Sequence, residues 1–229
     1  MIHQLPTLGL YCVQALLLGV LLVRGDRKRL ASVCIYLFLF LLLDGLARYY
    51  TLFHYGFRSL AYFEVYCLTD VILTVAAFAL ICALVRRACA SNKKVWHNLR
   101  PLLGLLFFLL VAGSYFMIAS NHGLRYPEFV VRFQRNTYLA CLVLTALLYI
   151  VVQRSGVRDE ELAMLVFGMG ILLAGPVAAL ALFKLFAQSD FVNVLINHVD
   201  QACMLGMLLT WWYAITRLPH GQYKNGSWG

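Results

Sequence analysis

Residues 60–85 read LAYFEVYCLTDVILTVAAFALICALV, and only Glu64 and Asp70 among them are charged. A helix rises about 1.5 Å per residue, so this stretch is long enough to cross the roughly 30 Å hydrocarbon core of a bilayer. Six other apolar stretches of similar length occupy most of the remaining chain. They run over Leu5–Val23, Leu30–Leu52, Pro101–Ser120, Pro127–Gln153, Glu161–Phe186 and Phe191–Ile215.

The composition argues against a soluble globular protein. Hydrophobic residues make up 62% of the 229 residues, and charged residues only 13%. A soluble chain of this length needs more polar surface than that to stay in water. We therefore expect an all-α, polytopic membrane protein, with a seven-helix transmembrane bundle over residues 1–216 and a short cytoplasmic tail over residues 217–229.

The basic residues predict how this bundle is oriented. If all seven stretches cross the bilayer, most of the nineteen Lys and Arg residues fall on one side. Cytoplasmic loops retain Lys and Arg, so we expect the N-terminus outside and the C-terminus inside. The placement of basic residues in the cytoplasmic connections thus explains the net charge of +9, and we expect no nucleic-acid partner. The residues on the basic side are Arg24, Arg27, Lys28, Arg29, Arg86, Arg87, Lys93, Lys94, Arg100, Arg154, Arg158, Arg217 and Lys224.

Several charged side chains fall within the predicted spans, all at the midplane or in the outer half. Each costs about 2.5–3.5 kcal/mol at the bilayer centre, so such groups usually face the bundle interior or mark a pathway. Neighbouring polar residues share their helix faces, because residues four and seven apart lie on one side of a helix. The resulting candidate ligand or ion pocket consists of Asp44, Arg48, Glu64, Tyr66, Asp70, Lys184, Asn193, Asn197 and Asp200.

Two interpretations of this polar group stay open. Polar side chains commonly hold membrane helices together, and Asp44 and Arg48, four residues apart, can simply neutralise each other. Alternatively, the group forms an outward-open pocket. Acids outnumber bases four to two among its charged members, so such a pocket favours a cation, a proton or a neutral polar ligand.

Glycine and proline interrupt the sixth stretch, where Gly175 and Pro176 follow Gly168 and Gly170. Pro176 removes a helical hydrogen bond near mid-membrane, so Gly175 and Pro176 form a candidate hinge or a static kink.

Residues at the ends of the stretches carry further predictions. Pro101 and Pro127 suit the first turns of their helices, and the acidic residues 159–161 suit the start of the sixth. The aromatic residues 211–213 are expected at the inner interface, as part of an aromatic belt.

Known catalytic and cofactor-binding patterns are missing from the sequence. Residues 191–215 contain no lysine that could carry retinal, and only His198 is placed to ligate a haem. His198 and Asp200 lie two residues apart, so they point about 200° apart around a helix and do not readily share a metal ion. There is no phosphate-binding or dinucleotide-binding glycine motif. We expect no catalytic residue, no metal and no cofactor.

Several soft features together resemble an uncharacterised group of bacterial seven-helix membrane proteins of about this length. They are the aromatic second stretch after a basic loop, Tyr62-Phe63-x-x-Tyr66, Arg132 with Arg135, the glycine-rich sixth stretch, and Trp211-Trp212-Tyr213. The resemblance implies a multi-pass protein of the bacterial inner membrane and no established activity.

Two classes of function are compatible with these patterns. The first is a receptor-like or sensory module, or a subunit of a membrane complex, that lies in the lipid bilayer and acts through a protein partner or as a homo-oligomer. The second is a small-solute or ion transporter that uses Asp70 and Asp200 at mid-membrane, with the candidate hinge nearby.

Overall fold

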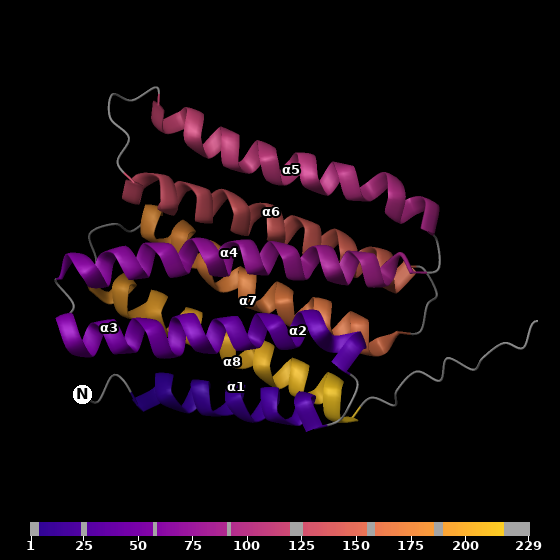
Figure 1. The fold of residues 1–229 in the computed structure, drawn as a ribbon, viewed down its shortest axis with the longest axis horizontal. Coiled ribbons are helices and arrows are strands. Elements are labelled where there is room, and N and C mark those ends of the chain that lie inside the picture. The colour runs from indigo at the N-terminus through magenta and orange to yellow at the C-terminus, as the bar shows by residue number, and fades with distance from the viewer. Residues whose placement is uncertain are drawn as a thin grey trace, which may run out of the picture.

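The computed structural model describes residues 5–23, 27–56, 59–90, 93–119, 126–154, 159–185 and 190–217, and nearly all of those residues are helical. The segments α2, η2 and α3 follow one another without a break and make one long rod (Figure 1). The bounds are α1 Leu5–Val23, α2 Arg27–Phe40, the π-helix η2 Leu41–Ala47, α3 Arg48–Tyr55, α4 Leu60–Ala88, α5 Lys93–Ala119, α6 Tyr126–Arg154, α7 Glu160–Leu185 and α8 Asp190–Arg217.

Successive rods run antiparallel, so the molecule has two ends (Figure 1). One is the α3–α4 end, where α1 begins and α3 passes into α4. The other is the α4–α5 end, where α4 passes into α5 and α8 finishes. Helix α4 lies between the α2–α3 rod and α6, whereas α5 and α1 lie at opposite margins. The closest packing joins α7 to α8.

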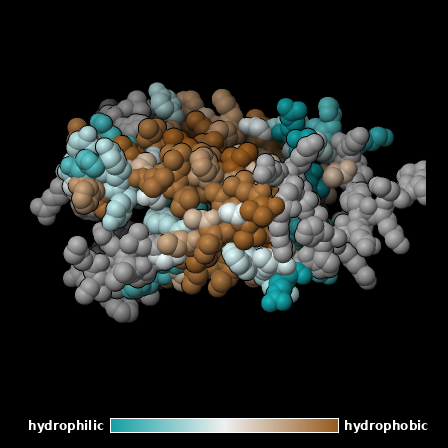
Figure 2. Space-filling view, turned by 60° about the horizontal axis from the view of Figure 1, so that its bottom comes forward, coloured by the Kyte–Doolittle hydropathy of each residue, from teal (hydrophilic) through white to brown (hydrophobic). Residues whose placement is uncertain are grey.

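Five helical segments among the described residues are long and apolar enough to cross a membrane: Leu30–Tyr55, Leu60–Ala88, Lys94–Phe116, Phe129–Gln153 and Glu160–Ala179. A shorter apolar helix covers Gly9–Val23. Figure 2 shows hydrophobic residues gathered along the middle of the molecule and hydrophilic residues toward its ends. An all-helical bundle with this distribution is compatible with a multi-pass membrane protein.

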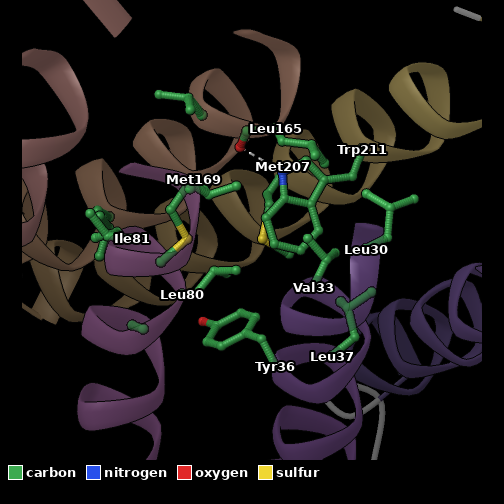
Figure 3. Close-up of a cluster of buried hydrophobic side chains, with 14 of the residues drawn as sticks. Leu30, Val33, Tyr36, Leu37, Leu80, Ile81, Leu165, Met169, Met207 and Trp211 are labelled. Atoms are coloured by element: carbon green, nitrogen blue, oxygen red, sulfur yellow. Dashed lines mark hydrogen bonds between the residues drawn. The ribbon is translucent and has the colours of Figure 1, made fainter. Parts of the chain in front are cut away.

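A buried tryptophan organises the core between α2, α4, α7 and α8. Trp211 on α8 is fully buried, and its indole Nε1 donates a hydrogen bond to the carbonyl oxygen of Leu165 on α7 at 2.9 Å. Tyr36 meets its ring edge-on, and Met169 and Ile81 belong to the same cluster (Figure 3). The prediction that this residue belongs to an interfacial belt is therefore wrong, because its only polar atom is satisfied inside the bundle.

Glycines explain how closely α7 and α8 approach. A Cβ atom on Gly168 would lie 2.6 Å from the Trp211 indole, and one on Gly175 would lie 3.0 Å from the Cβ of Cys203. Gly206 on α8 faces Ile171 on α7 in the same way, at 3.1 Å. Gly175 thus has a packing role, and α7 continues as a helix through Pro176. Its predicted hinge role stays a prediction.

Helix α5 begins earlier than predicted. The apolar pattern placed its start at Pro101, in the first turn, but the helix already begins at Lys93 and contains Pro101 in its interior. Five of the eight residues 93–100 are polar or charged, so a criterion based on hydrophobicity misses these first two turns. The proline costs one helical hydrogen bond, and its ring lies on an exposed part of the helix.

An ion cluster joins the far end of α4 to the start of α7. Arg87 donates to both carboxylate oxygens of Asp159, the shortest contact being 2.9 Å, and to Glu161 at 3.1 Å. Asp159 also accepts a hydrogen bond from the backbone N–H of Leu162 at 3.0 Å and so caps α7. The predicted acidic start of this helix is confirmed.

The α7–α8 contact predicts the effect of Gly168→Ala. The new methyl group would displace the Trp211 indole and weaken its bond to Leu165, so we expect a loss of about 1–3 kcal/mol in unfolding free energy. Gly104→Ala on α5 is the control, because nothing lies within 4 Å of that position and alanine favours a helix. Thermal unfolding in detergent measures both; equal melting temperatures would contradict the packing role.

The ion cluster predicts a difference between two adjacent arginines. Arg87→Gln should destabilise the protein by about 1–3 kcal/mol, because buried Glu161 loses its cation. Arg86→Gln should change stability by less than about 0.5 kcal/mol, since Arg86 is exposed and has no partner among the described residues. Chemical unfolding of the two variants in the same detergent makes the comparison.

Candidate functional site

Arg48 is the centre of the largest polar cluster in the described part of the chain. It opens α3 immediately after the π-helix, and its Nη1 donates to Asp44 Oδ1 at 2.6 Å. Its Nη2 pairs with the carboxylate of Asp70 on α4, and its Nε donates to Thr69 Oγ1 at 2.7 Å. One guanidinium therefore ties the α2–α3 rod to α4 through the carboxylate of Asp70 and the hydroxyl of Thr69, while Asp44 pairs with it from the same rod. We call Arg48, Asp44 and Asp70 the Arg48 triad.

An aromatic ring covers the guanidinium. The Arg48 Cζ atom lies 4.2 Å from the centroid of the Tyr66 ring, within the range of a cation–π contact. The Tyr66 backbone carbonyl also accepts from Arg48 Nη2 at 3.4 Å. Tyr66, Thr69 and Asp70 occupy one turn of α4, so that turn supplies the partners of Nε and Nη2, whereas Nη1 pairs with Asp44.

The first helix joins the triad through a tyrosine. Tyr11 on α1 donates its hydroxyl to Asp44 Oδ2 at 2.7 Å, so the two carboxylate oxygens of Asp44 have different partners. Three residues further along α1, Gln14 is buried and donates to the carbonyl oxygen of Leu37 at 2.9 Å. Asp44 itself lies within the π-helix, a distortion that is frequent at functional sites.

Burial and charge together define the electrostatics of the triad. The side chains of Arg48, Asp44 and Asp70 are 14%, 19% and 10% exposed. One formal positive charge and two negative charges leave a net charge of −1 at the triad. In a medium of low dielectric constant such a surplus attracts a cation, a proton or hydrogen-bond donors.

Polar side chains continue from the triad toward α6. Gln134 lies beside the carboxyl group of Asp70, and its Nε2 donates to the Tyr138 hydroxyl at 3.4 Å. On α4, Thr74 donates to the backbone carbonyl of Asp70 at 2.7 Å. The polar groups therefore extend across the bundle from α1 to α6.

The structure brings together four of the nine predicted site residues: Asp44, Arg48, Tyr66 and Asp70. Glu64 lies near the start of α4 and is exposed. Asp200 is also exposed; its carboxylate lies 3.1 Å from the position that a Cβ on Gly175 would take. The side chains of Lys184, Asn193 and Asn197 lie outside the described residues.

Tyr11 and Thr69 belong to the cluster but not to the predicted site. Tyr11 lies on a polar face of the first helix together with Thr7 and Gln14, so its inward direction could be foreseen. Its partner could not, because spacing within one helix carries no information about which neighbour it meets. Thr69 gave no signal, since a single threonine in an apolar helix usually bonds to its own backbone.

An apolar groove lies elsewhere, between α1 and the end of α8. It has a volume of about 950 Å³ and is lined by Cys12, Ala15, Leu16, Gly19, Val20, Val23 and Thr216. None of the predicted site residues borders it. Among the described residues, no three His, Cys, Asp or Glu side chains come together as a metal site would require.

Comparisons with known proteins assign no family to this chain. No protein-family model matches it, and neither the curated proteins nor the solved structures contain a match.

The triad predicts a specific pattern of stability. Arg48→Gln should lower the unfolding free energy by about 3–5 kcal/mol, because it leaves the buried carboxylate of Asp70 and the half-buried carboxylate of Asp44 without their cation. Adding Asp70→Asn to that variant should recover part of the loss by removing one of those charges. Thermal unfolding in detergent measures the series.

The control for this series is Glu64→Gln, which neutralises an exposed acid on the same helix. It should leave stability within about 0.5 kcal/mol of the original protein. A double variant no more stable than Arg48→Gln alone would show that the carboxylates do not share the arginine.

Proposed function

We propose that this chain is a receptor-like or sensory module of the bacterial inner membrane, or a subunit of a membrane complex there. In this proposal all seven rods cross the bilayer, with the N-terminus outside and the C-terminus in the cytoplasm. The Arg48 triad is the site at which an external signal acts.

The distribution of charge supports this orientation. Arg86, Arg87, Lys94, Arg100 and Arg217 all belong to helix segments at the α4–α5 end. The antiparallel order of the rods places the start of α1 at the opposite end (Figure 1). Cytoplasmic surfaces retain Lys and Arg, so the α4–α5 end fits the inner side and the α3–α4 end the outer side.

The observation that carries the proposal is the direct pairing of Arg48 with both carboxylates. Three rods meet at this arginine: α1 through Tyr11, the α2–α3 rod through Asp44, and α4 through Asp70. A ligand that takes either carboxylate must break an existing ion pair. Binding would therefore change how the three rods are held together, as a sensor requires.

The net charge of the triad indicates which ligands fit. A cation or a proton would neutralise the surplus negative charge of the triad. An anion would instead have to displace Asp44 or Asp70 from Arg48 against their charge. A cationic or protonating signal is thus the class that the site favours.

A partner is needed because the connections between helices are short. Only a few residues separate α4 from α5 and α6 from α7. A structural change at the triad would therefore have to reach a partner through contacts on the outer faces of the helices. Exposed apolar side chains such as Val143, Leu147 and Ile150 on α6 offer such a face to a membrane partner or to a second copy of the chain.

One observation favours transport as a second candidate. Asp200 is an exposed carboxylate within α8, and it lies against Gly175, next to Pro176 of α7. An acidic group beside a proline in a membrane helix can bind an ion and respond to helix bending. In this alternative, Asp70 and Asp200 carry the ion.

Reconstitution separates the two functions. We expect the purified chain alone in liposomes to move neither protons, followed with a pH-sensitive dye, nor potassium ions. We also expect membrane cross-linking of the tagged full chain to recover a partner protein or a second copy, and Arg48→Gln to reduce that recovery severalfold because it loosens three rods.

Glu64→Gln is the matched control and should retain full recovery. The receptor proposal would be overturned by ion movement that the chain supports alone and that Asp70→Asn or Asp200→Asn abolishes. It would also be overturned if the Arg48→Gln variant, shown to be helical by circular dichroism, recovered as much cross-linked partner as the original protein does.

A further inference from the structure

The first two turns of α5 carry a group of basic residues at the α4–α5 end. Lys94 and Arg100 are exposed there, and Arg86 is exposed in the last turn of α4, a few residues before. Between the two basic residues of α5, Trp96 packs against the hydrophobic core and holds the start of the helix in place. We call Arg86, Lys94 and Arg100 the basic corner.

The cations of the basic corner have no acidic partner among the described residues. Their neighbour Arg87 shows the contrast, since it is held by Asp159 and Glu161. The position of Lys94 adds to the effect, because the N-terminus of a helix already carries a partial positive charge and the first turn of α5 contains no acid. The corner is therefore strongly attractive to an anion.

An exposed apolar face continues directly below the corner. Lys94 and Leu105 are eleven residues apart, about three helical turns, so they lie on the same face of α5 and about 16 Å apart along its axis. Leu102 and Leu109 border that face and are exposed. Helix α5 lies at the margin of the bundle (Figure 1).

We propose that the basic corner binds an anionic phospholipid. Lys94, which lies above the apolar face, holds the phosphate of the headgroup, Arg86 and Arg100 add to the positive potential around it, and the acyl chains lie along the apolar face of α5. Charge complementarity identifies the headgroup, and the face below the cations identifies a ligand with long apolar chains. A soluble phosphate compound would use only the cations.

This site goes beyond the proposed signalling function and is distant from the Arg48 triad along α4. It needs the chain to lie in a membrane but does not depend on whether the chain senses or transports. Its test uses lipid alone and no partner or solute, so its outcome is independent of the cross-linking and reconstitution results.

The experiment is native mass spectrometry of the full chain in detergent, titrated with dioleoyl-phosphatidylglycerol or dioleoyl-phosphatidylcholine. We expect the anionic lipid to bind about tenfold more tightly, as several basic residues near one headgroup would produce. Lys94→Gln with Arg100→Gln should remove most of that difference. Equal binding of the two lipids to the original protein would overturn the proposal.

Arg217→Gln is the matched control. It removes an exposed cation from the same end of the molecule, but on α8, which lies away from α5 (Figure 1). The preference of this variant for the anionic lipid should stay within about twofold of the original. If Arg217→Gln lost as much of that preference as Lys94→Gln with Arg100→Gln, the preference would come from general surface charge, which would contradict a site at α5.

Two further measurements keep the test decisive. Lys94→Arg with Arg100→Lys retains both charges and should retain the lipid preference, whereas its loss would contradict recognition by charge. Inorganic phosphate at millimolar concentration should not displace the bound lipid; displacement would show that the cations hold a free phosphate and that the face of α5 contributes nothing.

Discussion

A charged group inside an apolar bundle must find its counter-charge within the protein, and Arg48 shows what that requirement does to a structure. The Arg48 side chain is largely buried, so its guanidinium takes its partners from the helices around it. Asp44 and Asp70 approach it from two rods, and Tyr11 brings in a third. The positions of α1, α3 and α4 at this end follow from the geometry of one side chain.

The rest of the bundle is held by different means. Helices α7 and α8 approach closely because glycines leave room for Trp211 and Cys203, and the indole satisfies its own N–H on the facing backbone. Helix α4 is fixed again at its other end, where Arg87 binds the acidic cap of α7. It is therefore anchored by ion pairs at two levels, with apolar packing between them.

Much of the fold could be predicted from the sequence, but only part of the candidate site. The helix ranges follow the apolar stretches closely, apart from the polar start of α5, because hydrophobicity reports where a helix is apolar and not where it begins. Asp44 and Arg48 could be paired from their spacing along one helix. Asp70 as the third member, and Thr69 beside it, could not, since both belong to another rod. Trp211 was misplaced because a tryptophan near a helix end is equally typical of an interface and of a core.

The sequence by itself determined the class of this protein: an apolar helical chain with few charges, and with most of its basic residues in alternate connections. Those properties depend on composition and on position along the chain, which the sequence states directly. Only the tertiary structure decided which polar residues meet, since it selects the helix faces that come together. Asp70 meets Arg48 while Glu64, on the same helix, faces outward, and no local rule distinguishes them. Apolar stretches of the sequence determine which segments form helices, whereas the packing of those helices determines which side chains come into contact. A site consists of side chains in contact, so it depends on the packing.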